Sequence, residues 1–324
     1  MKILVTGAAG FIGSNLCEFL LSKGHQVIGL DNFNDYYSPK VKRFNIESFE
    51  KNANFQLAEI DILNVEGLES MFTTHRPEAI VHLAGWAGVT YSVSNPKIYL
   101  EVNIVGTNNL AQMATKHGVN SFVFASTSSI YGNTNPVPFN ESMDSSKPAS
   151  PYPASKKAAE VLLWTYKTNF DLNVTIFRFF NPLGPKLRPD MALPKLVKAA
   201  EYGLEFPLYM LNIQTAARDY THIVPMLETM EYVCENPLSY EILNLGNSQP
   251  IELANLIQMV ERVTGKSIKI VKKPLPGQME VTYANVEAAK KIANYNPRFS
   301  AEQAVEEYYQ WFLKQPEWYK KGEY

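Results

Sequence analysis

The first half of the chain alternates short apolar runs with segments of helical periodicity. Ile12, Leu16, Phe19 and Leu20 recur at helical spacing just after the first run. Repeated strand–helix–strand units place parallel strands side by side, and right-handed crossovers then build a doubly wound sheet. The pattern therefore predicts an α/β fold of the Rossmann type, with strands in the apolar runs Ile3–Val5, Val27–Leu30, Phe55–Ile60, Ala79–Ala84, Ser121–Ala125 and Val174–Phe179.

The rhythm changes after residue 181, where prolines become more frequent and several helical stretches follow. We expect a Rossmann domain over residues 1–181 and a smaller C-terminal α/β substrate domain over residues 182–324, with segments that interleave. The aromatic helix expected at 301–314 reads as core packing. Two polar connections, 32–54 and 133–150, stand outside the pattern, and the second is expected to lie over the site.

A glycine-rich turn connects the first strand to the first helix. Its glycines are Gly7, Gly10 and Gly13, in the sequence TGAAGFIG. The first permits a tight turn, the second a close approach of backbone to a pyrophosphate, and the third close packing of helix and strand. The helix start at Phe11 and Ile12 offers unpaired N–H donors to phosphates. This context predicts a dinucleotide site.

Acidic residues follow the next two strands. Asp31 ends the second strand about 20 residues after the glycines, where a carboxylate accepts hydrogen bonds from ribose hydroxyls and repels a 2′-phosphate. Asn32 follows, with no arginine at either position, which favours NAD over NADP. Asp61 and Ile62, after the third strand, are expected to meet the adenine.

Tyr152 and Lys156 form the strongest catalytic signal. Four residues apart on a helix, their side chains share one face. A phenol with its ordinary pKa near 10 is a poor base at neutral pH, but a nearby ammonium and a cationic nicotinamide both stabilise the phenolate. The hydroxyl cluster at residues 126–129, after the fifth strand, can hydrogen-bond a substrate oxygen beside the tyrosine.

Composition narrows the classes of partner. Lys and Arg total 30 against 32 Asp and Glu, a net charge of −2, so no basic surplus indicates nucleic acid. The two cysteines and five histidines show no metal-ligand spacing, and we expect no metal site. The first strand starts directly after Met1, and no apolar stretch reaches the roughly 18 residues that span a membrane. A cytoplasmic protein with a small-molecule substrate is expected.

Taken together, these motifs resemble the extended short-chain dehydrogenase/reductase family of nucleotide-sugar epimerases and dehydratases. The resemblance covers nearly all of the chain and includes the segments 82–85, 126–132 and 178–182. Three stretches, 31–37, 87–92 and 188–192, resemble the UDP-glucuronate 4-epimerases within it. The resemblance implies an NAD cofactor and a UDP-sugar substrate. It also implies further cofactor contacts from Leu83, Ala84, Gly85, Asn103 and Phe180.

By the same resemblance, Thr127 assists Tyr152 in catalysis, with Lys156 beside them. The residues implied to bind the UDP-sugar are Ser128, Ser129, Asn181, Arg188, Tyr209 and Arg218. Among these, Ser128 and Ser129 are expected near the sugar carboxylate, Tyr209 on the uracil and Arg218 on the diphosphate.

The identity of residues 128 and 129 selects the reaction within the family. Dehydratases carry Asp-Glu after the threonine and decarboxylases a Glu, whereas serines supply no carboxylate. C4 epimerisation, most closely of UDP-glucuronate, is therefore expected. Asn181 stands where glucuronate epimerases usually have Thr, residues 223–226 replace an acidic segment, and 277–280 lack a common Asp. UDP-glucose or UDP-N-acetylglucosamine 4-epimerase, decarboxylase and dehydratase remain the alternatives.

The helix that starts near Tyr152 continues with Val161, Leu162, Leu163 and Trp164, apolar on more than one face. One face packs on the sheet and the other needs a partner. The family often pairs such helices between subunits, so a homodimer is expected, with burial under the C-terminal domain as the alternative.

Overall fold

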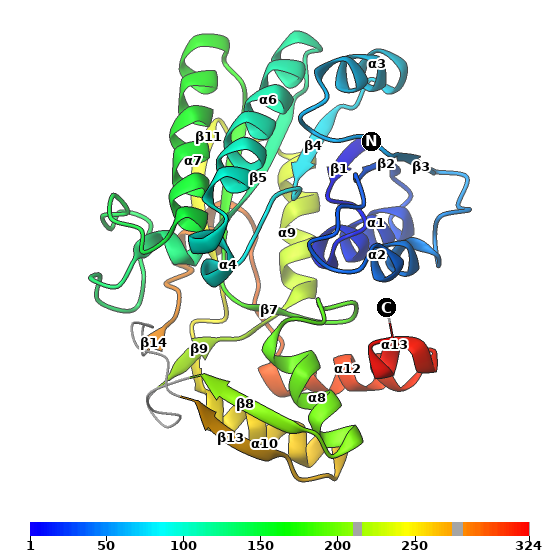
Figure 1. Cartoon of the computed structure of the whole chain (residues 1–324). Coiled ribbons are helices and arrows are strands. Elements are labelled where there is room, and N and C mark those ends of the chain that lie inside the picture. Colours follow the sequence, from blue (N-terminus) through cyan, green and yellow to red (C-terminus); the bar gives the residue numbers. More distant parts are fainter. Residues whose placement is uncertain (210–215, 274–280, 324) are drawn as a thin grey trace.

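A seven-stranded parallel sheet forms the centre of the computed structural model, which describes residues 1–209, 216–273 and 281–323. Its strand order is β11-β6-β5-β4-β1-β2-β3, so the chain winds outward in both directions from the middle (Figure 1). The predicted doubly wound Rossmann-type fold is confirmed. The strands are β1 (Lys2–Thr6), β2 (Gln26–Leu30), β3 (Phe55–Ala58), β4 (Ala79–His82), β5 (Ser121–Thr127), β6 (Val174–Phe179) and β11 (Tyr240–Leu245).

Side chains that alternate along each strand feed two separate apolar layers. In β1, Ile3 and Val5 belong to one buried cluster and Leu4 to the other. The first cluster receives α1 (Phe11–Ser22) and α9 (Ile223–Glu235), and the second receives α3 (Val65–His75), α6 (Thr107–Lys116) and α7 (Pro151–Phe170). Burial of both faces explains why the strands read as continuous apolar runs.

The polar connection 32–54 contains a short helix, α2 (Pro39–Ile46), which the apolar pattern did not indicate. Proline at its first turn fixes a helical φ, Val41 and Ile46 are buried, and the helix contacts α1. Two further short helices, α4 (Val89–Ser94) and α5 (Pro96–Leu100), precede a π-helical turn at Glu101–Gly106 that runs directly into α6.

The C-terminal half adds one strand to the main sheet and packs α9 against it, and its other elements form a layer of their own. β11 pairs with β6 over six residues, from Tyr240 beside Val174 to Leu245 beside Phe179. The remaining strands make small sheets: β7 (Pro182–Leu183) with β10 (Thr221–His222), β8 (Glu205–Tyr209) with β13 (Lys269–Lys273), and β9 (Ala217–Asp219) between β12 (Pro250–Glu252) and β14 (Val281–Thr282). The domain boundary after residue 181 stays a prediction.

Helices of the C-terminal half gather below the sheet in Figure 1. They are α8 (Ala192–Tyr202), α10 (Leu253–Thr264), α11 (Glu287–Ile292), α12 (Ala301–Leu313) and α13 (Glu317–Lys321). In α12, Tyr308, Tyr309 and Phe312 are buried in the first apolar cluster, the core position expected from the sequence.

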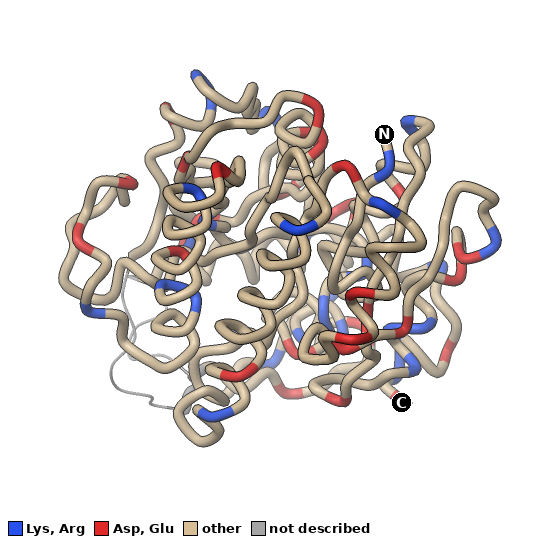
Figure 2. The backbone as a smooth tube through the Cα atoms, turned by 90° about the horizontal axis from the view of Figure 1, so that it is seen from above, with Lys and Arg blue, Asp and Glu red and all other residues tan. Residues whose placement is uncertain are grey.

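Basic and acidic residues are interspersed along the described chain (Figure 2). Both cysteines, Cys17 and Cys234, are buried and unbonded to each other. No helix in the described part of the chain combines the length and the apolar character needed to cross a membrane.

The glycine turn generates a stability prediction, because a methyl group at Gly13 would lie 2.0 Å from the carbonyl oxygen of Gly7. The carbonyl belongs to the backbone and the backbone of residue 13 fixes the methyl group in place, so neither can rotate away. Gly13→Ala should therefore destabilise the protein by about 3 kcal/mol, as overpacking does. A methyl group at Gly10 would lie 3.1 Å from the same carbonyl oxygen of Gly7, so Gly10→Ala should destabilise the protein less. Urea denaturation midpoints of the two variants test this, and equal midpoints would contradict it.

Candidate functional site

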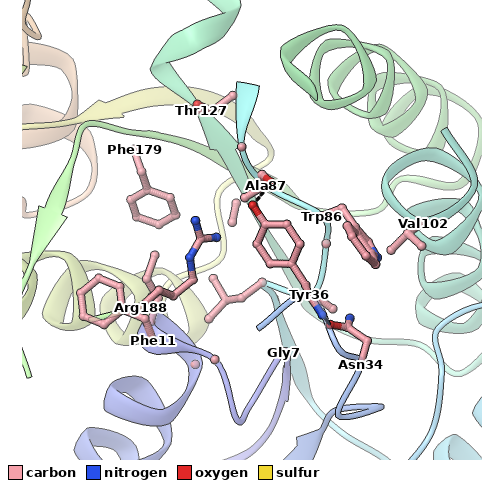
Figure 3. A pocket seen from close by; sticks show the side chains of 18 of the residues that line it. Gly7, Phe11, Asn34, Tyr36, Trp86, Ala87, Val102, Thr127, Phe179 and Arg188 are labelled. Atoms are coloured by element: carbon pink, nitrogen blue, oxygen red, sulfur yellow. Dashed lines mark hydrogen bonds between the residues drawn. The ribbon is translucent and has the colours of Figure 1, made fainter. Parts of the chain in front are cut away.

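A pocket opens at the carboxyl ends of the parallel strands, the edge where the loops after β1, β2, β4, β5 and β6 converge. It encloses about 410 Å³. Figure 3 shows Gly7 and Phe11 on its floor, Thr127 and Phe179 at the far side, and Tyr36 and Arg188 pointing into it. The pocket therefore extends from the glycine turn to the hydroxyl cluster, which lie far apart in the sequence.

At the glycine turn, the backbone and the start of α1 form a cradle without side chains. Gly7 adopts a positive φ of 70°, and its N–H donates to the carbonyl of Leu30 at 2.7 Å. A methyl group at Gly7 would lie 2.9 Å from the backbone nitrogen of Ala84. The first turn of α1 has no side-chain cap. Its free N–H groups face the pocket at Phe11, Ile12 and Gly13, which suits a pyrophosphate.

Asp31 is fixed by the backbone around it. Oδ2 accepts a hydrogen bond from the N–H of Ala9 at 3.0 Å, and Oδ1 accepts one from Phe33 at 2.8 Å. Each oxygen keeps a lone pair for a further donor. Asn32 donates to Asp61 at 2.6 Å, and both line the pocket together with Ile62. The carboxylates that the sequence placed after β2 and β3 are thus brought to one end of the pocket.

Tyr152 and Lys156 lie on the first turns of α7, and both line the pocket with Thr127 at the end of β5. Burial lowers the pKa of Lys156 to about 8, against the opposing charge of Glu160. Burial raises the pKa of Tyr152, while a hydrogen bond from Thr127 and the charge of Arg188 oppose that rise. In the protein alone the phenol is therefore neutral at neutral pH, and a further cation is needed to make it a base.

Beyond the tyrosine, Ser128, Ser129, Asn181 and Arg188 also line the pocket. The serines form a 3₁₀ turn, Ser128–Tyr131, that Thr127 caps by accepting from the N–H of Ser129. Asn181 has a positive φ of 24°, a conformation that asparagine tolerates better than most residues. The guanidinium of Arg188 donates to both carboxylate oxygens of Asp190 at 3.0 Å and lies 5.1 Å from the centre of the Tyr36 ring.

Leu83, Ala84 and Gly85 line the pocket after β4, but Asn103 is not among its lining residues. Asn103 is fully buried in the π-helical turn. Its side chain accepts from the N–H of Trp86 at 2.8 Å and donates to the carbonyl of the same residue at 2.9 Å. The structure therefore places Asn103 behind the loop, as a residue that holds the loop in position.

Two further predicted residues, Phe180 and Arg218, are not among the lining residues. Phe180 is fully buried and stacks near Tyr131 and Phe139, while its neighbour Phe179 lines the pocket. Phe180 points into the core because its N–H pairs with Leu245 and extends the ladder by one residue. Arg218 lies in β9 and is not among the lining residues. The Tyr209 side chain and the segment 277–280 lie outside what the structure describes.

Several lining residues were not found from the sequence. Lys42 of α2 is buried, and its ammonium donates to Asn34 at 2.7 Å; burial lowers its pKa and Asp31 opposes this. Tyr36 and Trp86 form an edge-on pair with ring centres 5.0 Å apart. A lysine in a polar helix reads as solvent-exposed, so no local signal marked Lys42. None of residues 133–150 lines the pocket, contrary to the expectation of a loop over it.

Comparisons with known proteins agree with this geometry. The family model described as "NAD dependent epimerase/dehydratase family" matches residues 3–246. A UDP-glucuronate 4-epimerase of Thermodesulfobacterium geofontis is 39% identical over 310 residues, covering 95% of each chain. The crystal structure of UDP-glucuronic acid 4-epimerase from Bacillus cereus with UDP-glucuronic acid and NAD has a TM-score of 0.89 at 32% identity, covering 100% of each chain. A Thermotoga maritima UDP-glucose 4-epimerase with UDP-glucose has a TM-score of 0.88 at 28% identity, covering 97% of this chain and 99% of its own.

The low pKa of Lys156 generates a pH prediction. The residue supports Tyr152 only as the ammonium ion, which is the form present below its pKa of about 8. Turnover should therefore fall as the pH rises past about 8. Lys156→Arg, which stays protonated throughout this range, should remove that alkaline decline even though its maximal rate is lower. A kcat–pH profile of both proteins tests this, and an identical alkaline decline in the variant would assign it to another group.

Proposed function

The chain belongs to the NAD-dependent epimerase/dehydratase family, and on that premise we propose that it interconverts UDP-glucuronate and UDP-galacturonate by epimerisation at C4. The named relatives and the solved structure with UDP-glucuronic acid and NAD support this choice. The observation that carries it is the guanidinium of Arg188, which points into the pocket on the side of Tyr152 (Figure 3). An arginine there complements the carboxylate that distinguishes a uronate from a neutral sugar.

The chain's own residues fit an NAD cofactor. A methyl group on Gly7 or Gly13 would collide with the backbone of Ala84 or of Gly7, so the two glycines permit the tight turn that a pyrophosphate needs. Asp31 has one lone pair per oxygen for a ribose hydroxyl. NAD⁺ held there would supply the hydride acceptor for C4 and a cationic nicotinamide ring that favours the Tyr152 phenolate. Asp31 repels the 2′-phosphate of NADP.

In the proposed reaction, Tyr152 removes the proton of the C4 hydroxyl and returns it to the C4 oxygen after the keto sugar has turned over and hydride has been delivered to the other face of C4. Lys156 holds its ammonium on the same helix face and stabilises the phenolate. Thr127 positions the phenol by the hydrogen bond that opposes the rise of its pKa. Burial excludes water from these groups, so the 4-keto sugar that forms between the two hydride transfers is protected.

The lack of acids near Tyr152 supports epimerisation over elimination. Among the described residues that line the pocket, the only carboxylates are Asp31 and Asp61, at the opposite end. Ser128 and Ser129 occupy the turn beside Thr127 and supply hydroxyl groups alone. A dehydratase needs a carboxylic acid at the sugar, whereas an epimerase needs no group beyond Tyr152 and the cofactor.

Asn181 favours a second candidate, a 4-epimerase for UDP-glucose or UDP-N-acetylglucosamine. Its amide lines the pocket beside Pro182, the Asn-Pro pair that resembles neutral-sugar epimerases. The likeness to the Thermotoga maritima structure with UDP-glucose supports it as well. Arg188 has no role with a neutral sugar, which is why we place this candidate second.

We further propose a cytoplasmic homodimer that supplies UDP-galacturonate for polysaccharide biosynthesis. The outer surface of α7 exposes Val161 by 55% and Trp164 by 50%. The adjoining helical segment exposes Leu100 by 48% and Val105 by 49%. Large apolar side chains on neighbouring helices are typical of a surface that a second copy covers.

The substrate proposal predicts the outcome of an anomeric-proton NMR assay with UDP-glucuronate, UDP-glucose and UDP-N-acetylglucosamine side by side. UDP-glucuronate should be converted, and the neutral sugars should be converted at least about tenfold more slowly, since they offer no carboxylate to the guanidinium of Arg188. Conversion of the neutral sugars alone would overturn the choice of substrate.

Tyr152→Phe tests the role of the tyrosine in turnover, because it removes the proton-transferring oxygen and keeps the ring. It should lose about 1,000-fold or more of the turnover while the purified protein still retains NAD absorbance. Unchanged turnover would refute the role of Tyr152.

The dimer proposal predicts that Trp164→Glu is monomeric. A charge on the outer surface of α7 disfavours burial there, so the sedimentation mass should fall from twice 36.6 kDa to once that value. Leu313→Glu is the control, since Leu313 is 43% exposed on α12. A dimeric Trp164→Glu protein would exclude this surface.

A further inference from the structure

A fully buried ion pair lies behind the catalytic end of the pocket. The side chains of Glu160 and Arg178 are each 1% exposed. Arg178 donates from Nε to Oε1 at 3.0 Å and from Nη2 to Oε2 at 2.8 Å, a bidentate pair. Ser126 donates to the same Oε1 at 2.6 Å, and the third nitrogen of Arg178 donates to the hydroxyl of Tyr131 at 3.0 Å. All strong donors and acceptors of this network therefore have partners.

The pair joins β6 to the two elements that carry the catalytic side chains, α7 and β5. Glu160 lies one helical turn after Lys156 and two turns after Tyr152 on α7. Ser126 directly precedes Thr127 on β5. Arg178 lies opposite Ser126 in the β5–β6 ladder. One carboxylate thus fixes the distance between the helix that holds the tyrosine and the strand that holds the threonine.

The other end of the network is anchored in the frame of the fold. The Tyr131 hydroxyl donates to Oδ1 of Asn244 on β11 at 2.7 Å, and the Asn244 amide donates to the carbonyl of Phe139 at 3.0 Å. Stability alone does not account for such a pair, because apolar residues of similar volume stabilise a core equally well or better. A bidentate fork does something that apolar contacts do not, since it fixes both distance and orientation.

We propose that Glu160 and Arg178 are positioning residues for hydride transfer, which hold Lys156 and Thr127 at a fixed distance from the phenol of Tyr152. The proposal rests on the proposed function. Neither residue lines the pocket, so both act through the groups that do.

The charges around Lys156 support this role. Burial disfavours its ammonium, and Glu160 is the carboxylate that opposes the loss of the proton. On β4, buried His82 is kept neutral, since burial and the charge of Lys156 both lower its pKa. The groups that face Tyr152 are Thr127, Arg188 and Tyr36, together with the ring of Tyr99. If the Glu160 charge were removed, Arg178 would stay unbalanced and Lys156 would lose its proton at a lower pH.

The first test follows Lys156 directly, in the cofactor-free protein, by NMR of lysines labelled with ¹³C at Cε. The Lys156 signal is assigned by its absence from Lys156→Arg. In Glu160→Gln its pKa should fall by about one unit. Glu231→Gln is the matched control: it removes a carboxylate that contacts His25, just before β2, at 3.0 Å, and should leave the Lys156 pKa unchanged. An unchanged Lys156 pKa in Glu160→Gln would refute the claim that the Glu160 carboxylate stabilises the Lys156 ammonium.

The second test is turnover of UDP-glucuronate by NAD-loaded protein. Glu160→Gln should lower kcat about tenfold or more and leave KM within about twofold, because misplacement affects the transition state and not substrate binding. Should this variant fail to fold, Arg178→Lys and Ser126→Ala retain the charges and remove one or two hydrogen bonds; they should lower kcat about threefold with an unshifted pH profile.

Two outcomes separate this inference from the proposed function. Wild-type protein that converts no UDP-sugar would refute the function itself. Wild-type activity together with unchanged kcat in all three variants would refute the positioning role alone.

Discussion

Parallel strand pairing is the constraint on which the site depends. Because every strand of the main sheet points the same way, the residue that follows each strand is delivered to one edge. The register sets Thr6 beside His82 and Ser126 beside Arg178, which brings the glycine turn and the hydroxyl cluster to the same pocket. The ladder thus brings the strand ends together, while Thr127 at the end of β5 and Tyr152 and Lys156 on the first turns of α7 supply the chemistry.

Burial has two opposite effects at this edge. It lowers the pKa of Lys156 and raises that of Tyr152, so both side chains are pushed toward their neutral forms. The protein balances this with fixed groups, the carboxylate of Glu160 on one side and the hydroxyl of Thr127 with the guanidinium of Arg188 on the other. One additional positive charge in the pocket is therefore enough to change the protonation state of the Tyr152/Lys156 pair.

Local spacing explains what could be predicted from the sequence. The glycine turn, Asp31 and the Tyr152/Lys156 pair each depend on a few adjacent residues whose geometry is set by one strand end or one helix turn. Lys42 and Tyr36 reach the pocket only because α2 folds inside a polar segment, and that depends on contacts distant in sequence. For Asn103 and Phe180, the sequence indicates which segment lies near the pocket but not where the side chain points. The π-helical turn determines this for Asn103, and the backbone hydrogen bond from Phe180 to Leu245 determines it for Phe180.

The edge strand β11 is the last strand of the main sheet to be synthesised. A ribosome produces β1 to β6 first, yet the ladder beyond β6 stays open until Tyr240–Leu245 emerges, after much of the C-terminal half. During synthesis the apolar surface of β6 and the polar network around Arg178 and Tyr131 lack the Asn244 that completes them. The nascent chain thus carries an open sheet edge at β6 until residues 240–245 have been made, and such an edge can pair with another chain.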